Sequence, residues 1–328
     1  QENLAGVVQD IAAHEFFHIV TPLTIHSEEI QYFNYDEPVM SEHLWLYEGV
    51  TEYHAHLVQV RQGLIEPDEF LQRMQGKMEN SSSYYNDTLA FTDMSKNVIT
   101  DYYAQYGNVY QKGALIGMCL DIKLRELSDG EYGLKDLVAD LSNRYGKDNP
   151  FKDEELFDVM AELSGFPEVK EFMLTYVAGS TPLDFDEAYE TVGASFVEEE
   201  VQLFQWGINW TFNEDSSMAE VTDVGSLTEF GKDIGFEVGD LVYEINGISM
   251  KVDNMQYVSQ IVGHLKSQMK DGDDFTAKVY RKNDDGEMVS VTLEAKASSI
   301  TQAQSRIDWV ENPSEQQVKI RKAWLNRS

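Results

Sequence analysis

Several residue types that would point to particular protein classes are scarce in this chain. It has one cysteine, Cys119, so no intramolecular disulfide can form. No run of about 18 apolar residues occurs, and we therefore predict no membrane-spanning segment. Basic residues number 25 against 58 acidic ones, which gives a formal net charge of −33. Such a charge repels nucleic-acid phosphates, so nucleic acid is excluded as a partner.

The remaining composition is that of a folded protein with more than one domain. Hydrophobic residues make up 42% of the chain and aromatic residues 12%, which excludes a disordered polymer. A length of 328 residues suffices for two domains with a core each. The chain begins Gln1-Glu2-Asn3, with neither an initiator methionine nor a signal peptide. We expect this to be a cut end with sequence missing upstream.

Apolar residues recur at helical spacing through residues 1–197, the predicted first domain. A helix is predicted over residues 4–20, ended by Pro22, and a second one after the N-cap Ser41. Cys119 lies in an apolar segment and is predicted to be a buried small side chain. Further helices are expected at 67–79, 107–127, 133–145, 153–163 and 167–178.

Short β-rich segments separated by glycine and aspartate turns mark residues 198–297 as a second, small β domain. One helix is expected there, over residues 254–269, and the turn 284–286 is predicted to close a hairpin. The last segment, 298–328, is a basic tail with Trp309 and Trp324, which either docks onto the acidic protein or remains mobile. Strands are predicted at 218–221, 240–245, 275–280 and 289–293.

The segment His14-Glu15-Phe16-Phe17-His18 places two histidines four residues apart on the first predicted helix. Side chains at that spacing lie one turn apart on the same face, so both can bind one metal ion. Neutral imidazoles suit Zn2+, and a third protein ligand leaves a position for water. Glu15 is placed to accept a proton from that water. The alternative is a pair of core histidines without a metal, because the pattern also occurs by chance.

Glu48 is the favoured third ligand because it interrupts an otherwise apolar helical segment, residues 44–53. It precedes Gly49, which weakens a helix, and a buried carboxylate needs a counter-charge that zinc would supply. His43 is the main competitor and Glu52 the next. Glu52 lies one turn beyond Glu48 and is better placed as the hydrogen-bond partner of a ligating histidine. The other histidines of this helix are predicted on its exposed half: His54 and His56.

Together these segments resemble the glycyl aminopeptidase family of gluzincin zinc metallopeptidases, over residues 1–178. The pattern of two histidines is followed by Leu44-Trp45-Leu46-Tyr47-Glu48-Gly49 and by Tyr110-Gln111-Lys112-Gly113, which is similar to a Tyr-x-Lys-Gly segment of that clan. The wide separation of His18 from Glu48, and residues 120–126, fit this family better than the aminopeptidase N family. A departure follows His18: Ile19-Val20-Thr21-Pro22 stands where the family often has Trp-Asn and a basic run.

The resemblance implies a mainly α-helical, thermolysin-like catalytic domain that binds Zn2+ through His14, His18 and Glu48. Glu15 would be the general base, and Tyr110 would donate a hydrogen bond to the oxyanion of the tetrahedral intermediate. The implied reaction is removal of a small N-terminal residue such as Gly or Ala. The element with which the family holds a substrate's amino group is not in this sequence. Aminopeptidase action is therefore implied by the resemblance alone.

The β domain has glycine-containing segments, residues 224–227, 235–242 and 245–248, that resemble a bacterial PDZ domain. A PDZ domain also accompanies glycyl aminopeptidases. The resemblance implies capture of a peptide C-terminus by backbone N–H groups near Gly207-Ile208-Asn209. The alternative is a domain that packs against the peptidase and binds nothing. Acidity and this domain pairing favour an exported protein, periplasmic or extracellular, with a cytoplasmic one left open.

Zinc-dependent peptide-bond hydrolysis is thus the leading hypothesis. A rival of another class is a catalytically inactive protein that binds peptides through its PDZ domain. A further possibility is a different gluzincin hydrolase or an endopeptidase. The complete set of site residues argues against the inactive protein: His14, Glu15, His18, Glu48 and Tyr110.

Overall fold

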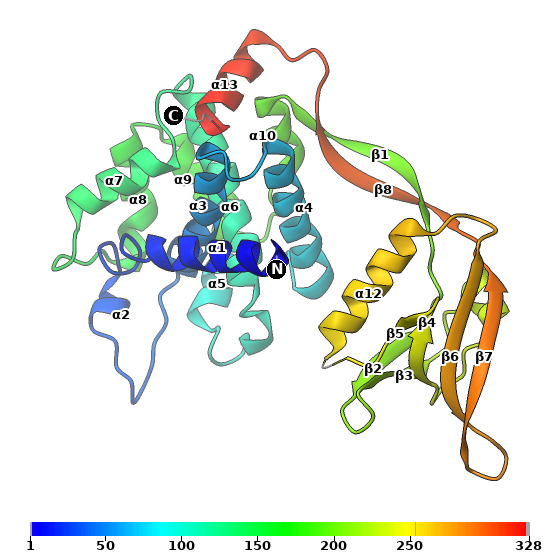
Figure 1. Cartoon of the computed structure of the whole chain (residues 1–328). Coiled ribbons are helices and arrows are strands. Elements are labelled where there is room, and N and C mark those ends of the chain that lie inside the picture. The colour runs from blue at the N-terminus through cyan, green and yellow to red at the C-terminus, as the bar shows by residue number, and fades with distance from the viewer. Residues whose placement is uncertain (1, 253, 326–328) are drawn as a thin grey trace. The chain divides into compact units, whose positions relative to one another are not determined.

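The computed structural model describes residues 2–252 and 254–325 (Figure 1). The chain divides into two compact units, unit 1 with Gln1–Val197 and Arg306–Ser328, and unit 2 with Glu198–Ser305. Unit 1 is helical, whereas unit 2 is built on an antiparallel sheet. Parts of each predicted domain lie outside the described residues: Gln1, Asp253 and the end of the basic tail, 326–328, with Arg327.

Unit 1 is made of α-helices, short 3-10 turns (η2, η3) and two π-helical turns (η1, η4). None of the helices that the structure describes is both long and apolar enough to cross a membrane. In chain order the elements are α1 (Glu2–Phe17), α2 (Glu28–Gln31), η1 (Trp45–Gly49), α3 (Val50–Arg61), α4 (Pro67–Tyr84), α5 (Phe91–Lys96), η2 (Tyr103–Gln105), α6 (Asn108–Leu127), α7 (Leu134–Arg144), η3 (Asp153–Glu155), α8 (Leu156–Ser164), α9 (Glu168–Phe172), η4 (Met173–Val177), α10 (Phe185–Val192) and α13 (Glu315–Leu325).

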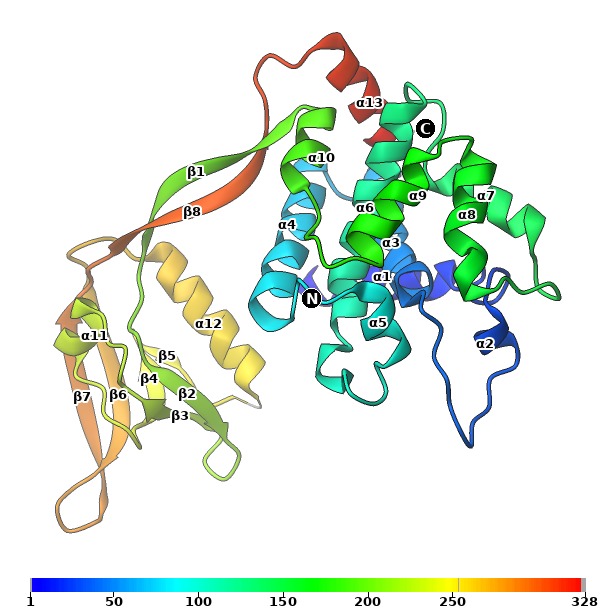
Figure 2. The same cartoon turned by 180° about the vertical axis from the view of Figure 1, so that it is seen from behind.

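Helix α6 is the centre of unit 1, and it contacts η1, α3, α4, α7, α9, α10 and α13 (Figures 1 and 2). Its sequence explains this place, because residues 112–122 are buried on every side of the helix. A helix that is apolar on all faces is stable when other helices surround it. Cys119 is among these residues and is buried, as predicted.

The end of the chain also belongs to unit 1. Residues 298–325 of the predicted tail contain a strand, β8 (Ile300–Trp309), and the helix α13. Trp324 is fully buried and donates a hydrogen bond from Nε1 to the hydroxyl of Tyr53 in α3, 2.7 Å away. Arg61 donates to the carbonyl of Trp324 as well. The tail was expected either to dock onto the protein or to remain mobile, and the contacts of α13 with α3 agree with docking.

Helix α1 ends earlier than predicted, at Phe17 and not at residue 20. Pro22 has no N–H to donate to the carbonyl one turn back, so the helical ladder cannot continue through it. The chain instead makes tight turns, in which Ile19 N donates to Phe16 O and Val20 N to Phe17 O. His18 is therefore the first residue after the helix, still one turn from His14.

Unit 2 contains a six-stranded sheet in the order β2-β3-β4-β6-β7, with β5 paired to β4. β6 and β7 pair in register from Asp274↔Lys296 to Lys282↔Met288. This confirms the predicted hairpin, whose turn contains Gly286 at φ 81°. The elements are β2 (Asn209–Asn213), β3 (Met218–Asp223), α11 (Glu229–Ile234), β4 (Leu241–Ile245), β5 (Ile248–Ser249), α12 (Met255–Gln268), β6 (Asp274–Lys282) and β7 (Met288–Lys296).

The core of unit 2 lies between the sheet and its helices. α12 contributes Val258, Val262 and Leu265 to it, and β6 contributes Phe275 and Val279. A separate two-stranded ribbon is formed by β1 (Ala194–Leu203) and β8, and the division between the units falls within both strands.

Candidate metal centre

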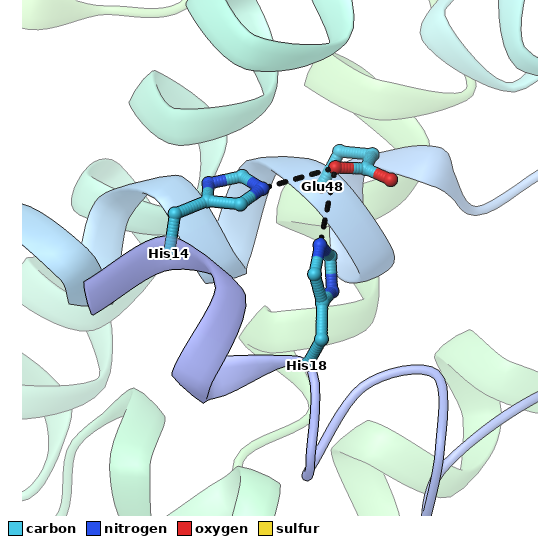
Figure 3. A group of neighbouring side chains, drawn as sticks. All are labelled: His14, His18 and Glu48. Atoms are coloured by element: carbon cyan, nitrogen blue, oxygen red, sulfur yellow. Dashed lines mark hydrogen bonds and ion pairs between the residues drawn. The ribbon is translucent and has the colours of Figure 1, made fainter. Parts of the chain in front are cut away.

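Three side chains from two segments of unit 1 converge on one point (Figure 3). His14 lies in the last turn of α1, His18 follows that helix, and Glu48 lies in η1. Glu48 Oε2 is 3.3 Å from His14 Nε2 and 3.7 Å from His18 Nε2. Their ligand atoms all lie within 4.8 Å of one another. In the described part of the chain, no other group of three or more histidine, cysteine or carboxylate side chains meets that condition.

The second ring nitrogen of each histidine is already engaged. His18 Nδ1 donates to the carbonyl of Thr21 at 2.8 Å, and His14 Nδ1 donates to Glu52 Oε2 at 2.7 Å. Since a carbonyl and a carboxylate accept, both Nδ1 atoms carry the proton, and in the neutral rings both Nε2 lone pairs face the shared point. Two imidazoles and one carboxylate, with the imidazoles held from behind, are the donor set of a catalytic zinc site. The residues fit Zn2+.

Glu48 is brought to the centre by the π-helical turn η1. The other four residues of this turn are buried, whereas the side chain of Glu48 is 21% exposed. A threonine pair supports the widened turn: Thr21 Oγ1 donates to the carbonyl of Leu46, and Thr51 Oγ1 donates to that of Tyr47. The segment after His18 is therefore tied both to His18 and to the element that carries Glu48.

The carboxylates around His14 set its charge. Burial lowers the pKa of His14, but the hydrogen bonds and negative charges of Glu48 and Glu52 outweigh it and raise that pKa to about 9. Burial raises the pKa of Glu52, but the hydrogen bonds from His14 and His56 and the charge of Lys77 outweigh burial. The pKa of Glu52 is therefore held well below its ordinary value. Glu52 is thus ionised, and His14 must lose a proton from Nε2 before it can bind a metal.

The two predicted catalytic residues flank the three ligands. Glu15 follows His14 in α1 and is exposed to solvent. Tyr110 lies in the first turn of α6, with its ring centroid 5.8 Å from that of His14. Burial, the hydrogen bond with Tyr106 and the negative charge of Glu48 raise the pKa of Tyr110. Tyr110 therefore keeps its proton and can donate a hydrogen bond at neutral pH.

A close contact between two glycines brings Tyr110 to this place. A Cβ built on Gly113 would lie 2.9 Å from the Cα of Gly49, so the backbones of η1 and α6 touch. The glycine after Glu48 and the glycine three residues after Tyr110 have the same purpose, because only residues without a side chain allow this approach. The two sequence segments that carried the resemblance thus pack directly against each other.

Of the two competing candidates for the third ligand, His43 lies away from the centre and Glu52 is a hydrogen-bond partner of His14. His43 is buried, bonds through Nε2 to the carbonyl of Asp153, and is outside the cluster. Glu52 binds His14 from behind, as expected. The prediction that His54 and His56 are exposed is wrong, because both are only 7% exposed. α3 packs against α1, α4, α6 and α13 at once, so it has little exposed surface.

Two contributors were not predicted from the sequence. Lys77 of α4 is buried, and its Nζ lies 2.7 Å from Glu52 Oε1. Its only signal in the sequence was a lysine at a position where an amphipathic α4 would place an apolar side chain. Thr21 acts through its backbone carbonyl as well as its hydroxyl group, and a carbonyl leaves no mark in a sequence.

A cavity of about 270 Å³ opens elsewhere in unit 1, between α6, α9, η4 and α10. Its lining includes Cys119, Lys123 and Tyr176 but none of the predicted site residues. Lys123 pairs there with Glu126 and Glu187. The cavity is therefore distinct from the candidate metal centre.

Residues 8–116 match the family model of the M61 glycyl aminopeptidases, a region that contains all five predicted site residues. This region of the chain is therefore similar to peptidases of that family. The chain is also similar in structure to an aminopeptidase N family protein from Idiomarina loihiensis, with a TM-score of 0.61 and 19% sequence identity. That likeness covers 98% of this chain and 55% of the solved one, and it concerns the fold. No curated protein sequence matches the chain.

Proposed function

We propose that unit 1 is a zinc-dependent peptidase whose metal ligands are His14, His18 and Glu48. The observation that carries the proposal is that the two nitrogens of each imidazole have different partners. Each Nε2 faces Glu48 Oε2. The Nδ1 of His14 donates to Glu52, and that of His18 donates to the carbonyl of Thr21. The family match supports a peptide as the substrate.

A zinc ion, when bound, supplies a Lewis acid that acidifies a water molecule and polarises the scissile carbonyl. Glu15 accepts the proton of the attacking water and returns it to the leaving amine. Tyr110, protonated at neutral pH, donates a hydrogen bond to the developing oxyanion. Glu52 holds His14 from behind and keeps its Nε2 directed toward the ligand point.

The finer specificity is part of the proposal. We propose an aminopeptidase that removes small N-terminal residues such as Gly or Ala, since the matched family model is that of glycyl aminopeptidases. The structural neighbour, which is titled an aminopeptidase N family protein, is consistent with the same class. This chain spans about half of that protein, so a complete substrate cleft is itself a point to test.

The test combines metal analysis of the purified chain with hydrolysis assays. We expect about one zinc per chain, lost in His14→Ala, and cleavage of Gly- and Ala-arylamides in preference to an amino-blocked peptide. Cleavage of the blocked peptide alone would overturn the aminopeptidase assignment and favour an endopeptidase. Zinc binding without hydrolysis of either substrate would favour the inactive, peptide-binding alternative.

For unit 2 we propose a PDZ-like role, capture of a peptide C-terminus. The supporting observation is that β2 lies at one end of the strand order, so one of its edges is available for an added strand. Gly207, which precedes β2 in the expected binding loop, has a φ of 73°. The test is titration of a peptide library with free and with amidated C-termini. Equal binding of both forms, or none of either, would remove this role.

A further inference from the structure

Lys77 is a buried cation with an unusual pair of contacts. It lies in the middle of α4, and its side chain is 10% exposed. Its Nζ donates to Glu52 Oε1 at 2.7 Å, and the backbone carbonyl of Tyr110 lies 3.5 Å from the same nitrogen. One ammonium group therefore contacts both the carboxylate behind His14 and the residue proposed to bind the oxyanion.

The two oxygens of Glu52 have different partners. Oε2 accepts from His14 Nδ1, whereas Oε1 accepts from Lys77 and from His56 Nε2, which is 3.2 Å away. Arg73 Nη1 lies 3.2 Å from His56 Nδ1. A guanidinium can only donate, so His56 Nδ1 accepts from Arg73 and His56 Nε2 donates to Glu52. Lys77, with its Nζ 2.7 Å from Oε1, brings a formal positive charge directly to Glu52.

Glu52 needs that charge. Its side chain is 20% exposed, and it lies across the His14 ring from a second carboxylate, Glu48. Like charges at this separation repel, and a half-buried carboxylate without a cation would turn toward solvent. His14 would then lose the acceptor that fixes its ring, and its Nε2 would no longer be held toward the ligand point.

We propose that Lys77 is a positioning residue of the metal centre, one that anchors Glu52 so that Glu52 can orient His14. The inference rests on the proposed zinc site. Lys77 does not reach the metal point itself and acts through Glu52. Its second contact, with the carbonyl of Tyr110, holds the start of α6 to the same group. α4 thereby joins the metal ligands to the oxyanion donor.

The test is a double-mutant cycle on zinc affinity, measured by competition with a chelator of known affinity. Lys77→Met removes the charge and keeps an unbranched side chain one atom shorter, and Lys77→Gln is a second neutral replacement. Each is measured alone and in a Glu52→Gln background. Lys77→Arg keeps the charge. Lys123→Met is the matched control, since Lys123 also pairs with two carboxylates of unit 1, away from the metal centre.

We expect Lys77→Met and Lys77→Gln to weaken zinc binding about tenfold, the lower end of the range for groups behind metal ligands. Lys77→Arg retains most of the affinity, and Lys123→Met all of it. In the Glu52→Gln background the loss from Lys77→Met disappears, because its route to His14 is already gone. A general loss of folding would instead lower the affinity in both backgrounds.

Two results would overturn the inference: wild-type zinc affinity in a folded Lys77→Met protein, or an equal loss with and without Glu52. The proposed function can fail separately. If zinc binds in a manner that depends on His14 and Lys77 but no peptide is hydrolysed, the peptidase proposal falls and the positioning role stands. If the wild-type chain binds no zinc through His14, both fall.

Discussion

The interiors of the two units differ in polarity. Among the described residues, buried polar and charged side chains are numerous in unit 1, whereas in unit 2 Asp240 alone belongs to this group. Asp240 serves its fold, since it accepts from the backbone N–H of Glu237 and from the guanidinium of Arg281. In unit 1, the buried Lys77 and His56 instead donate hydrogen bonds to Glu52, the residue that holds His14 of the candidate metal centre.

The contrast separates buried polar groups that stabilise a fold from those that lie beside the candidate metal centre. A buried polar group costs free energy unless it is paired, so each such group either completes a pairing within the fold or serves a neighbouring site. Unit 2 forms an apolar core, and Asp240, the buried charged side chain among its described residues, lies at a turn. Unit 1 retains polar side chains where they can orient His14. The predictions below test this separation.

The largest effect is expected from Glu15→Gln. Loss of the general base should lower hydrolysis by about 10²–10⁴-fold, while zinc affinity stays unchanged because Glu15 is outside the ligand group. Steady-state kinetics and chelator competition measure the two quantities. Glu229→Gln, the same change at an exposed position of unit 2, is the control and should alter neither. Full activity of Glu15→Gln would remove the mechanism.

Asp240→Ala tests the other side of the comparison. The change leaves the Arg281 guanidinium without its buried partner, and unit 2 should lose about 3–5 kcal/mol of stability. Calorimetry should show its transition at a lower temperature, with zinc affinity in unit 1 unaffected. Asp274→Ala, which breaks the exposed pair with Lys296, should cost less than about 1 kcal/mol. A drop in zinc affinity would contradict the separation of roles.

Zinc binding should depend steeply on pH. Because the pKa of His14 is raised to about 9, a proton occupies its Nε2 at neutral pH and must leave before the metal binds. The apparent Kd should fall by about tenfold per pH unit up to about pH 8. In the metal-free protein, by contrast, a rise in pH should lower the free energy of unfolding. The raised pKa stabilises the fold below the ordinary value of 6.5, and this contribution is lost as the pH rises through about 9. A Kd independent of pH would contradict the assignment.

The smallest effect is expected from His54→Phe. The ring of His54 stacks on that of Phe17, with the ring centroids 4.6 Å apart. The buried Nε2 of His54 has no hydrogen-bond partner. An apolar ring should therefore change the free energy of unfolding at pH 7 by less than about 1 kcal/mol. Burial lowers the pKa of His54 to about 4, so the unfolded state gains protons first as the pH falls below 6.5. Urea unfolding should show the variant becoming relatively more stable between pH 6.5 and 4. A large loss at neutral pH would show that the hydrogen bond from His54 Nδ1 to the carbonyl of Val50, 2.9 Å long, stabilises the fold.

Helical spacing predicted that His14 and His18 share a face, and the charge of Glu48 within an apolar segment made it the candidate third ligand. The support of His14 by Glu52 was predicted from its place one turn beyond Glu48. The sequence did not identify Lys77, whose contact with Glu52 joins α4 to α3 and depends on packing. Periodicity also misplaced His54 and His56, since it describes one buried face and α3 has several. The ribbon of β1 and β8 went unpredicted because both strands are largely exposed and lack an apolar alternation.

The backbone contact between Gly49 and Gly113 has a consequence for any attempt to redesign this protein. Side-chain rotamers play no part in the spacing between the helix of Glu48 and that of Tyr110, so the spacing cannot be adjusted by repacking. A substitution that widens the crossing would move the metal ligand and the oxyanion donor apart together. A redesign must therefore keep glycine at both positions if Glu48 and Tyr110 are to keep their separation.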